Sequence, residues 1–275
     1  MRRNKENIIK GEISFGSYGK AFLTGNKERD HDIYVSKKNT NRAFPGDLVA
    51  LKITYSNKNQ RWEGRVIKIL ERRRRLFVGV LEINGNFGFV SSTEKNISTD
   101  FYISPEKMKG FKDGEKVVVK LLDWPRENKS PFGEIIRSFG KGEQYESEIK
   151  AILFENKIRE KFPQEVLEEL KKIEKEEKGE QQRTDFREEN VFTIDPISAK
   201  DFDDAISFKK EGEENVKIGV HIADVTHYIK PGTALDKEAY KRGTSLYLPD
   251  RVVPMLPEKI SNELCSLNPG EEKKT

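Results

Sequence analysis

The sequence has almost nothing with which to cross-link itself or to hold a soft metal. Its 275 residues include a single cysteine, Cys265. One cysteine cannot form an internal disulfide, and it cannot provide the paired thiolates of a structural zinc site. Both classes are therefore excluded, Cys265 is interpreted as a small buried hydrophobic residue, and the reducing cytoplasm is the simplest location.

Long apolar segments are also absent. The N-terminal stretch MRRNKENIIKGEIS lacks the apolar core of a signal peptide, and no apolar run approaches the ~20 residues of a membrane-spanning helix. We therefore expect no membrane partner. Charged residues make up 36% and hydrophobic residues 35% of the chain, which is long enough for two or three domains with a highly charged surface.

The charge is unevenly distributed along the chain. Residues 1–142 contain 29 Lys and Arg against 17 Asp and Glu, a balance of +12, whereas residues 143–275 contain 22 against 30, a balance of −8. This distribution favours a front half that binds a polyanion and a back half that acts on it through a cation. A solvated surface with a random bias is the simpler alternative.

The front half contains an internal repeat. The segments GSYGKAFL (16–23), HDIYVS (31–36) and FPGDLVALKI (44–53) are followed, in the same order, by GNFGFV (85–90), TDFYIS (99–104) and FKDGEKVVVKLL (111–122). Each copy is a series of short alternating strands punctuated by Gly, Asn, Asp and Pro, which is typical of a small all-β barrel. We predict one barrel at residues 1–71 and a second at residues 72–142.

Aromatic residues gather on two neighbouring predicted strands of each copy. Aromatic side chains surrounded by Lys and Arg form stacking platforms for single-stranded nucleic acid, at about 1–3 kcal/mol per base. For any one residue, a place in the barrel core is the alternative. The pattern NFGFV…DFYIS resembles the paired RNA-binding motifs of cold-shock OB-fold domains, which makes the following residues candidates for RNA binding: Tyr18, Phe22, Tyr34, Phe87, Phe89, Phe101 and Tyr102.

Two charged segments flank the second copy. ERRRRL, with arginines 72–75, is interpreted as a solvated linker that contacts phosphate. Residues 143–189 show helical apolar spacing on either side of Pro163, which predicts a connector of two helices, each packing an apolar stripe on a neighbouring domain. No chemistry is assigned to this connector.

Four aspartates are crowded into the stretch VFTIDPISAKDFDDAISF, residues 191–208. Asp195, Asp201, Asp203 and Asp204 lie between two apolar segments that are predicted strands. An acidic surface turn is one interpretation. A calcium-binding EF-hand loop fails on spacing, because it requires a polar fifth position and a sixth-position glycine after Asp201, where the chain has Ala205 and Ile206.

A magnesium site for phosphate chemistry explains the four aspartates best. Mg²⁺ prefers oxygen ligands and usually takes a few carboxylates together with substrate phosphates. Two such ions about 3.5–4 Å apart activate water and stabilise the leaving oxygen of a phosphodiester. If a strand begins at Asp201, alternation directs Asp201 and Asp203 to the same side.

The segment TIDPISAKDFDDAISF and the continuation from VHIADVTHYIKPG to NELCSLNPGE closely resemble the start of the catalytic domain of the ribonuclease II/ribonuclease R family, whose order of domains is also two cold-shock domains followed by this segment. The resemblance is nearest to ribonuclease R. It implies two OB-fold barrels, a helical connector at 143–189 and the first part of an α/β RNB catalytic domain at 190–275.

This resemblance implies a processive 3′→5′ exoribonuclease that hydrolyses single-stranded RNA to nucleoside 5′-monophosphates. By position, Asp195 and Asp201 resemble the magnesium ligands, Asp203 the carboxylate required for catalysis, and Asp204 its companion at the metal or the RNA end. Tyr247 in SLYLPD resembles the tyrosine that stacks on the terminal nucleotide. The implied cofactor is Mg²⁺, with Mn²⁺ as a substitute, and the implied partners of this monomer are RNA, the ribosome and the RNA-decay machinery.

The chain departs from the family pattern at both ends. It begins near the first barrel, without a helix-turn-helix extension, and stops at NPGEEKKT, before the later catalytic segment and the C-terminal RNA-binding domain. We expect apolar surface at FTI, VKIGVHI and VVPML to lie exposed. The alternative function is therefore an RNA-binding module without turnover; a DNA-binding cold-shock protein would require the aspartates to be a coincidence.

The remaining polar residues of the back half receive structural interpretations. Asp224 in HIADV is expected to order a turn. His221 and His227 are expected to pack or to form hydrogen bonds rather than to bind a metal. No Ser-His-Asp arrangement has supporting context.

Overall fold

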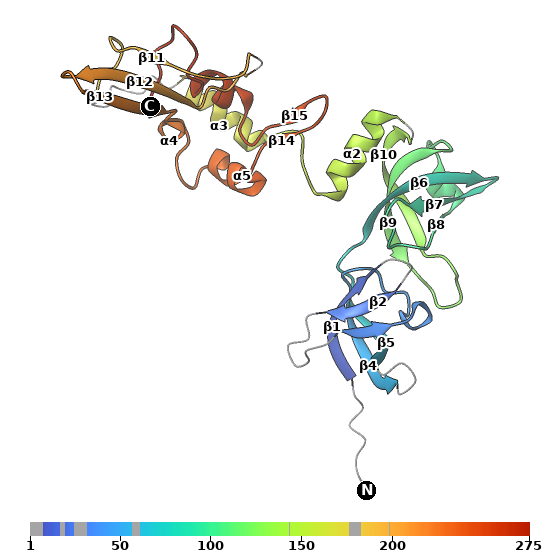
Figure 1. Cartoon of the computed structure of the whole chain (residues 1–275). Helices are drawn as coiled ribbons and strands as arrows, with labels where there is room; N and C mark the ends of the chain where they lie inside the picture. Colours follow the sequence, from blue (N-terminus) through green and yellow to red (C-terminus); the bar gives the residue numbers. More distant parts are fainter. Residues whose placement is uncertain are drawn as a thin grey trace. The chain divides into compact units, whose positions relative to one another are not determined.

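The computed structural model describes residues 8–16, 20–24, 32–56, 61–142, 144–175, 183–197 and 199–275. The chain divides into two compact units, Met1–Lys157 and Ile158–Thr275 (Figure 1). The first unit contains two β-barrels and one of the predicted connector helices. The second contains the other helix and the aspartate-rich segment.

The first barrel is closed by five strands in the order β1-β2-β3-β5-β4. Alternation along the strands directs one face inward; in β2, for example, Ala21 and Leu23 are buried and Phe22 is half-buried. A short 3₁₀ helix follows β3. The bounds are β1 Ile8–Phe15, β2 Ala21–Thr24, β3 Ile33–Val35, η2 Lys37–Asn39, β4 Leu48–Ser56 and β5 Arg61–Glu71.

The second barrel repeats this topology. Its order β10-β8-β7-β6-β9 has the same neighbours, including one parallel pair, β8 with β10, that matches β3 with β5 in the first barrel. Both barrels are consistent with OB folds, so the predicted fold class is confirmed. The bounds are β6 Leu76–Asn84, β7 Phe87–Ser92, β8 Phe101–Ile103, α1 Pro105–Met108, β9 Glu115–Asp123 and β10 Phe132–Lys141.

The two barrels share core residues. Phe44, from the loop between β3 and β4, is buried in the core of the second barrel, 4.8 Å from the ring of Phe77. Two linker arginines are also engaged: Arg72 pairs with buried Asp47 at 2.7 Å, and Arg74 pairs with Glu94. The interpretation of residues 72–75 as a solvated linker is therefore wrong for these two arginines.

The predicted connector is divided between the two units. Helix α2 (Tyr145–Glu155) packs Ala151 against Val78, Val118 and Phe139 of the second barrel. Helix α3 (Gln164–Lys175) buries Val166 in the core of the second unit. The two helices do pack on neighbouring domains, but the boundary between the units falls within the segment predicted to join them.

The second unit is built on a three-stranded antiparallel sheet, β11-β12-β13. Its helices pack around a core that includes Ala223, Leu235, Ile260 and Cys265. None of the described helices is long and apolar enough to cross a membrane. The bounds are β11 Val191–Phe192, β12 Asp204–Glu211, β13 Asn215–Ile222, α4 Val225–Tyr228, α5 Ala234–Arg242, β14 Leu246–Tyr247, β15 Val252–Val253 and the π-helix η3 Lys259–Leu264.

One face of β13 lies open to solvent. Four apolar residues at every second position of this strand are 54–68% exposed: Val216, Ile218, Val220 and Ile222. Phe192 and Ile194 are exposed nearby in sequence, at 41% and 82%. The predicted exposure is therefore confirmed for FTI and VKIGVHI, and VVPML is divided, since Val252 is 41% exposed and Val253 is buried.

Candidate functional site

An aromatic cluster covers part of the surface of the second barrel. Tyr102 on β8 lies 5.9 Å from Phe89 on β7 and 5.5 Å from Phe132 on β10, measured between ring centroids. Phe87 lies 5.8 Å from Phe89 and is exposed. Strand pairing produces this arrangement, because Tyr102 is the register partner of both Phe89 and Phe132. The cluster offers several ring faces and edges to a nucleotide base.

Phe101 does not belong to this surface. Its side chain is 0% exposed and lies in the barrel core with Phe44 and Phe77. Consecutive residues of a strand point to opposite faces, so Tyr102 can face outward only if Phe101 faces inward. The prediction that Phe101 stacks on RNA is therefore wrong.

The first barrel carries a smaller aromatic pair. Phe22 on β2 and Tyr34 on β3 are register partners, with ring centroids 5.8 Å apart. The guanidinium of Arg61 lies 3.8 Å from the centroid of the Tyr34 ring. This combination of an edge-to-face aromatic pair and a cation suits an RNA backbone and base. Tyr18, the other candidate of this copy, lies outside the described residues.

A basic pocket of about 730 Å³ lies between the two barrels, within the first unit. No acidic side chain lines it among the described residues. Trp124 contributes an aromatic wall, and the guanidinium of Arg42 lies 5.7 Å from its ring. The charge favours phosphate groups, and it comes from six side chains: Lys37, Lys38, Arg42, Arg65, Arg126 and Lys129.

The four aspartates of the second unit lie around the start of β12. Asp195 follows β11, Asp201 and Asp203 lie in the irregular segment before β12, and Asp204 is the first residue of that strand. All four are exposed. Strand β12 therefore begins three residues after Asp201, where alternation would have placed Asp201 and Asp203 on the same side. One ladder-like hydrogen bond does reach back to this segment, since the Ala223 N–H donates to the Asp203 carbonyl at 2.9 Å.

The carboxylates act on one another electrostatically. Partial desolvation raises the pKa of Asp203, and the negative charges of Asp201, Asp204 and Asp195 raise it further. Every group that shifts this pKa among the described residues raises it, and none is a cation. Oxygen donors with uncompensated charge fit a hard divalent cation in chemistry, yet no group of three or more acidic, His or Cys side chains among the described residues converges closely enough to hold one.

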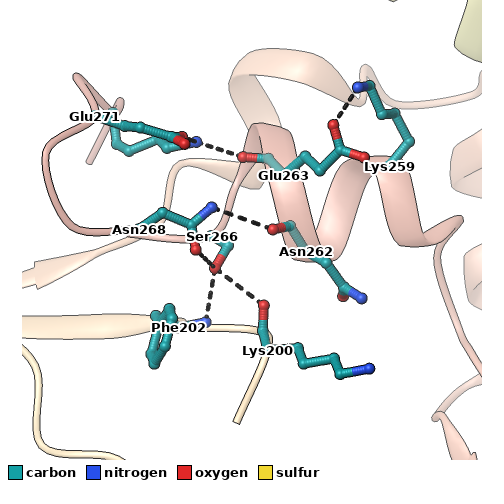
Figure 2. Close-up of polar contacts among 9 residues, drawn as sticks. Lys200, Phe202, Lys259, Asn262, Glu263, Ser266, Asn268 and Glu271 are labelled. Carbon is teal, nitrogen blue, oxygen red and sulfur yellow. Dashed lines mark hydrogen bonds and ion pairs between the residues drawn. The ribbon is translucent and has the colours of Figure 1, made fainter.

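The segment that carries Asp201 and Asp203 is held by residues 266–268. The Phe202 N–H donates to Ser266 Oγ at 3.0 Å, and the Leu267 N–H donates to the Phe202 carbonyl at 2.9 Å. Figure 2 shows Ser266 between Lys200 and Phe202 on one side and Asn268 on the other. Ser266 is fully buried. Sequence reasoning missed this residue, because it follows the aspartates by more than 60 positions.

Other candidates have structural roles or stand apart. Tyr247 ends the two-residue strand β14 and is 71% exposed, so its ring is accessible. Asp224 accepts the His227 N–H at 2.9 Å and caps α4, as expected of a turn-ordering residue. His221 forms a buried hydrogen bond with Ser207 at 2.9 Å, which agrees with its structural interpretation.

Two protein-family models match the chain. A cold shock domain model matches residues 23–83 and 89–163. An RNB domain model matches residues 183–275, a range that contains Tyr247, Ser266 and all four aspartates.

The similar proteins are ribonucleases R from bacteria. The chain is 38% identical to ribonuclease R of Thermotoga maritima over 100% of its own length and 39% of that protein. It is 33% identical to ribonuclease R of Escherichia coli over 97% of its length and 33% of that protein. The chain therefore spans about two fifths or less of these relatives.

Solved structures of ribonuclease R are also similar to this chain. Mycoplasma genitalium RNase R in complex with ribose-methylated single-stranded RNA matches 96% of this chain and 42% of that one, with a TM-score of 0.79 and 26% identity. Its complex with double-stranded RNA matches 76% of this chain, with a TM-score of 0.64. Yeast Ssd1, described as a pseudonuclease, shares the fold at 22% identity and a TM-score of 0.62.

Proposed function

Because this chain belongs with the ribonuclease R-like proteins of the RNB family, we propose that it forms the RNA-binding barrels and the carboxylate site of a metal-dependent 3′→5′ exoribonuclease. The substrate is single-stranded RNA, degraded processively to nucleoside 5′-monophosphates. The observation that carries the proposal is the similarity to ribonucleases R along the whole of this chain, with all four aspartates inside the RNB match.

The first unit binds the RNA in this proposal. Bases stack on the surface cluster of Phe87, Phe89, Tyr102 and Phe132, and phosphates bind in the basic pocket between the barrels. Stacking tolerates any base, and phosphate contacts carry no sequence information directly, so this interface suits an enzyme that must degrade any sequence.

The second unit provides the chemistry. Asp195, Asp201, Asp203 and Asp204 would hold Mg²⁺, or Mn²⁺ in its place, since their oxygen donors suit a hard cation and no cation of the described part of the chain shifts the pKa of Asp203. When bound, such ions activate a water and stabilise the leaving oxygen of the phosphodiester. The exposed ring of Tyr247 would stack on the terminal nucleotide and hold it during hydrolysis.

A second candidate function is RNA binding without turnover. Two observations favour it: the exposed apolar face of β13, and the lack of a converged metal-binding group among the described residues. The fold is also shared by a pseudonuclease, so the fold by itself does not establish catalysis.

One assay separates the two candidates. The purified chain is incubated with 5′-labelled RNA bearing a 3′ overhang, with Mg²⁺ or with EDTA, beside Asp203→Asn and the control Glu213→Gln. Glu213 is an exposed acid in the turn between β12 and β13, so this control removes one negative charge outside the aspartate cluster.

The exoribonuclease predicts a Mg²⁺-dependent ladder that ends in a short 5′-labelled remnant, is lost in Asp203→Asn and is retained in Glu213→Gln. The binding module predicts intact RNA in every lane together with a gel shift that weakens as salt increases. A chain that gives neither cleavage nor a shift would contradict both functions.

A further inference from the structure

We propose that Ser266 is a positioning residue for the carboxylate site: its buried hydroxyl fixes the backbone from which Asp201 and Asp203 project. The inference deepens the proposed function and rests on it. It assigns a role in cation binding to a residue that has no carboxylate and lies outside the aspartate-rich stretch.

The first step in the argument is the pairing of Phe202, the residue between the two aspartates. Its N–H donates to Ser266 Oγ at 3.0 Å, and its carbonyl accepts the N–H of Leu267 at 2.9 Å. Both backbone groups of the residue between the two carboxylates are thus partnered by consecutive residues of one distant segment. Fixing this peptide restricts the backbone directions of both neighbouring side chains.

The second step is the orientation of the Ser266 hydroxyl. A hydroxyl accepts through its lone pairs and donates its single proton to one acceptor at a time. The Lys200 carbonyl at 3.3 Å and Asn268 Oδ1 at 3.1 Å are both within reach of that proton (Figure 2). Asn268 is itself oriented, because its Nδ2 donates to the Asn262 carbonyl at 3.3 Å.

The third step is the rigidity of the element that presents Ser266. It follows the π-helix η3, where the Cys265 N–H donates to the Ile260 carbonyl five residues earlier. Ile260 and Cys265 are buried in the core of the second unit. Single π-turns are rare and often occur at functional sites, and this one precedes Ser266, whose hydroxyl lies 3.0 Å from the Phe202 nitrogen.

The fourth step is the electrostatic need for such a support. The carboxylates of this segment repel one another, since, in addition to desolvation, the negative charges of Asp201, Asp204 and Asp195 raise the pKa of Asp203. The segment at 199–203 forms no strand or helix that would oppose this repulsion. The contacts to Ser266 and Leu267 hold the Phe202 peptide in place against this repulsion.

The test uses the full chain and titrates it with Mn²⁺, with the free ion measured by electron paramagnetic resonance. Outer-shell partners of metal ligands typically change metal affinity by about 10–100-fold. We expect Ser266→Ala to raise the Kd for Mn²⁺ by at least 10-fold. Ser266→Cys keeps a side chain of similar shape but only a weak hydrogen-bonding group, so it should also raise the Kd for Mn²⁺. This second variant keeps the test valid if Ser266→Ala folds poorly.

Ser207→Ala is the matched control. Ser207 is also a buried serine of the second unit, but its hydroxyl bonds to His221 at 2.9 Å. It should lose comparable stability and retain the wild-type Kd for Mn²⁺. A second readout is hydrogen exchange at the Phe202 amide, which should become faster in Ser266→Ala and remain unchanged in Ser207→Ala.

The outcomes separate this inference from the proposed function. A wild-type chain that binds Mn²⁺ no better than Asp203→Asn overturns the metal site, and the role of Ser266 with it. Mn²⁺ binding that needs Asp203 but is within two-fold of wild type in both folded Ser266 variants overturns the positioning role alone. An increase in Kd equal to that of Ser207→Ala also refutes it, because the effect would then reflect a general loss of stability.

Discussion

Removal of the Asp47 carboxylate should uncouple the two barrels. Its Oδ2 accepts the N–H of Phe44 at 2.8 Å and Nη1 of Arg72 at 2.7 Å, and its Oδ1 accepts the N–H of Arg73 at 3.3 Å. The side chain is fully buried, and burial raises the pKa of Asp47 although Phe44 and Arg72 oppose that shift. One carboxylate thus holds both the linker and the loop that inserts Phe44 into the second barrel.

The expected cost follows from this geometry. Removing one partner of a buried ion pair typically costs about 3–5 kcal/mol, because the other charge is left uncompensated. The Arg72 side chain is 17% exposed and still donates to the Arg42 carbonyl at 2.8 Å, which favours the lower end. We expect Asp47→Ala to lose about 3 kcal/mol, or roughly 100-fold in the folding equilibrium.

Urea unfolding followed by tryptophan fluorescence measures this loss. The chain has two tryptophans, and a Trp62→Phe background leaves Trp124 as the reporter. The Trp124 ring lies 5.4 Å from the ring of Phe44, so its emission reports on the junction between the barrels. The free energy of unfolding of the Trp62→Phe chain is compared with that of the same chain carrying Asp47→Ala.

The double variant Asp47→Leu with Arg72→Met provides the control. It removes both charges and fills the space with apolar atoms, a change that is often neutral or stabilising for buried pairs. It should therefore be more stable than Asp47→Ala. A loss below about 1 kcal/mol in Asp47→Ala, or a double variant that is less stable still, would refute the reasoning.

Three further predictions concern the proposed RNA-binding surface, the core of the second barrel and the stability of the fold at low pH. Phe89→Ala should weaken RNA binding by roughly 5- to 150-fold in a gel-shift titration, whereas Ile136→Ala, at an exposed position of the same barrel, should leave binding unchanged. Phe101→Ala should cost about 3–5 kcal/mol in urea unfolding, since its ring is fully buried. Arg183 lowers the pKa of Asp224 to about 2, so the ionised carboxylate stabilises the fold above its unfolded pKa of about 3.9, and this contribution is lost as pH falls towards 2. The stability difference between wild type and Asp224→Asn should therefore shrink over that pH range, and a constant difference would contradict the assignment.

The barrels could be predicted because their information is local. Alternating strands and turn residues recur in two copies, and the structure closes both copies into the same five-stranded topology. Local patterns did not determine which aromatic residues face outward, which is why Phe101 was misplaced. Phe132 was missed for a different reason: the parallel pairing of β10 with β8 places it beside Tyr102, and no local pattern encodes that pairing.

For the aspartate segment too, the sequence predicts the local features but not the tertiary contacts. Four carboxylates within ten residues were visible in the sequence, and their mutual influence on Asp203 follows from that proximity. The strand start at Asp204 and the hydrogen bonds from residues 266–268 were not visible, because they depend on tertiary contacts between segments more than 60 positions apart. Spacing identifies the donors of a site, but distant backbone contacts determine how they are held.

The two parts of the proposed function rest on two units that differ in how far their apolar side chains are covered. Both barrels of the first unit are closed, and the proposed RNA-binding surface lies on this unit. The second unit leaves four apolar side chains of β13 at 54–68% exposure, next to the strand that begins with Asp204. A contiguous exposed apolar face of this kind is typical of an interaction site, and whatever shifts β13 would reach Asp204 through the β12–β13 pairing. RNA affinity and cleavage should therefore respond independently to mutation, and a variant that loses one need not lose the other.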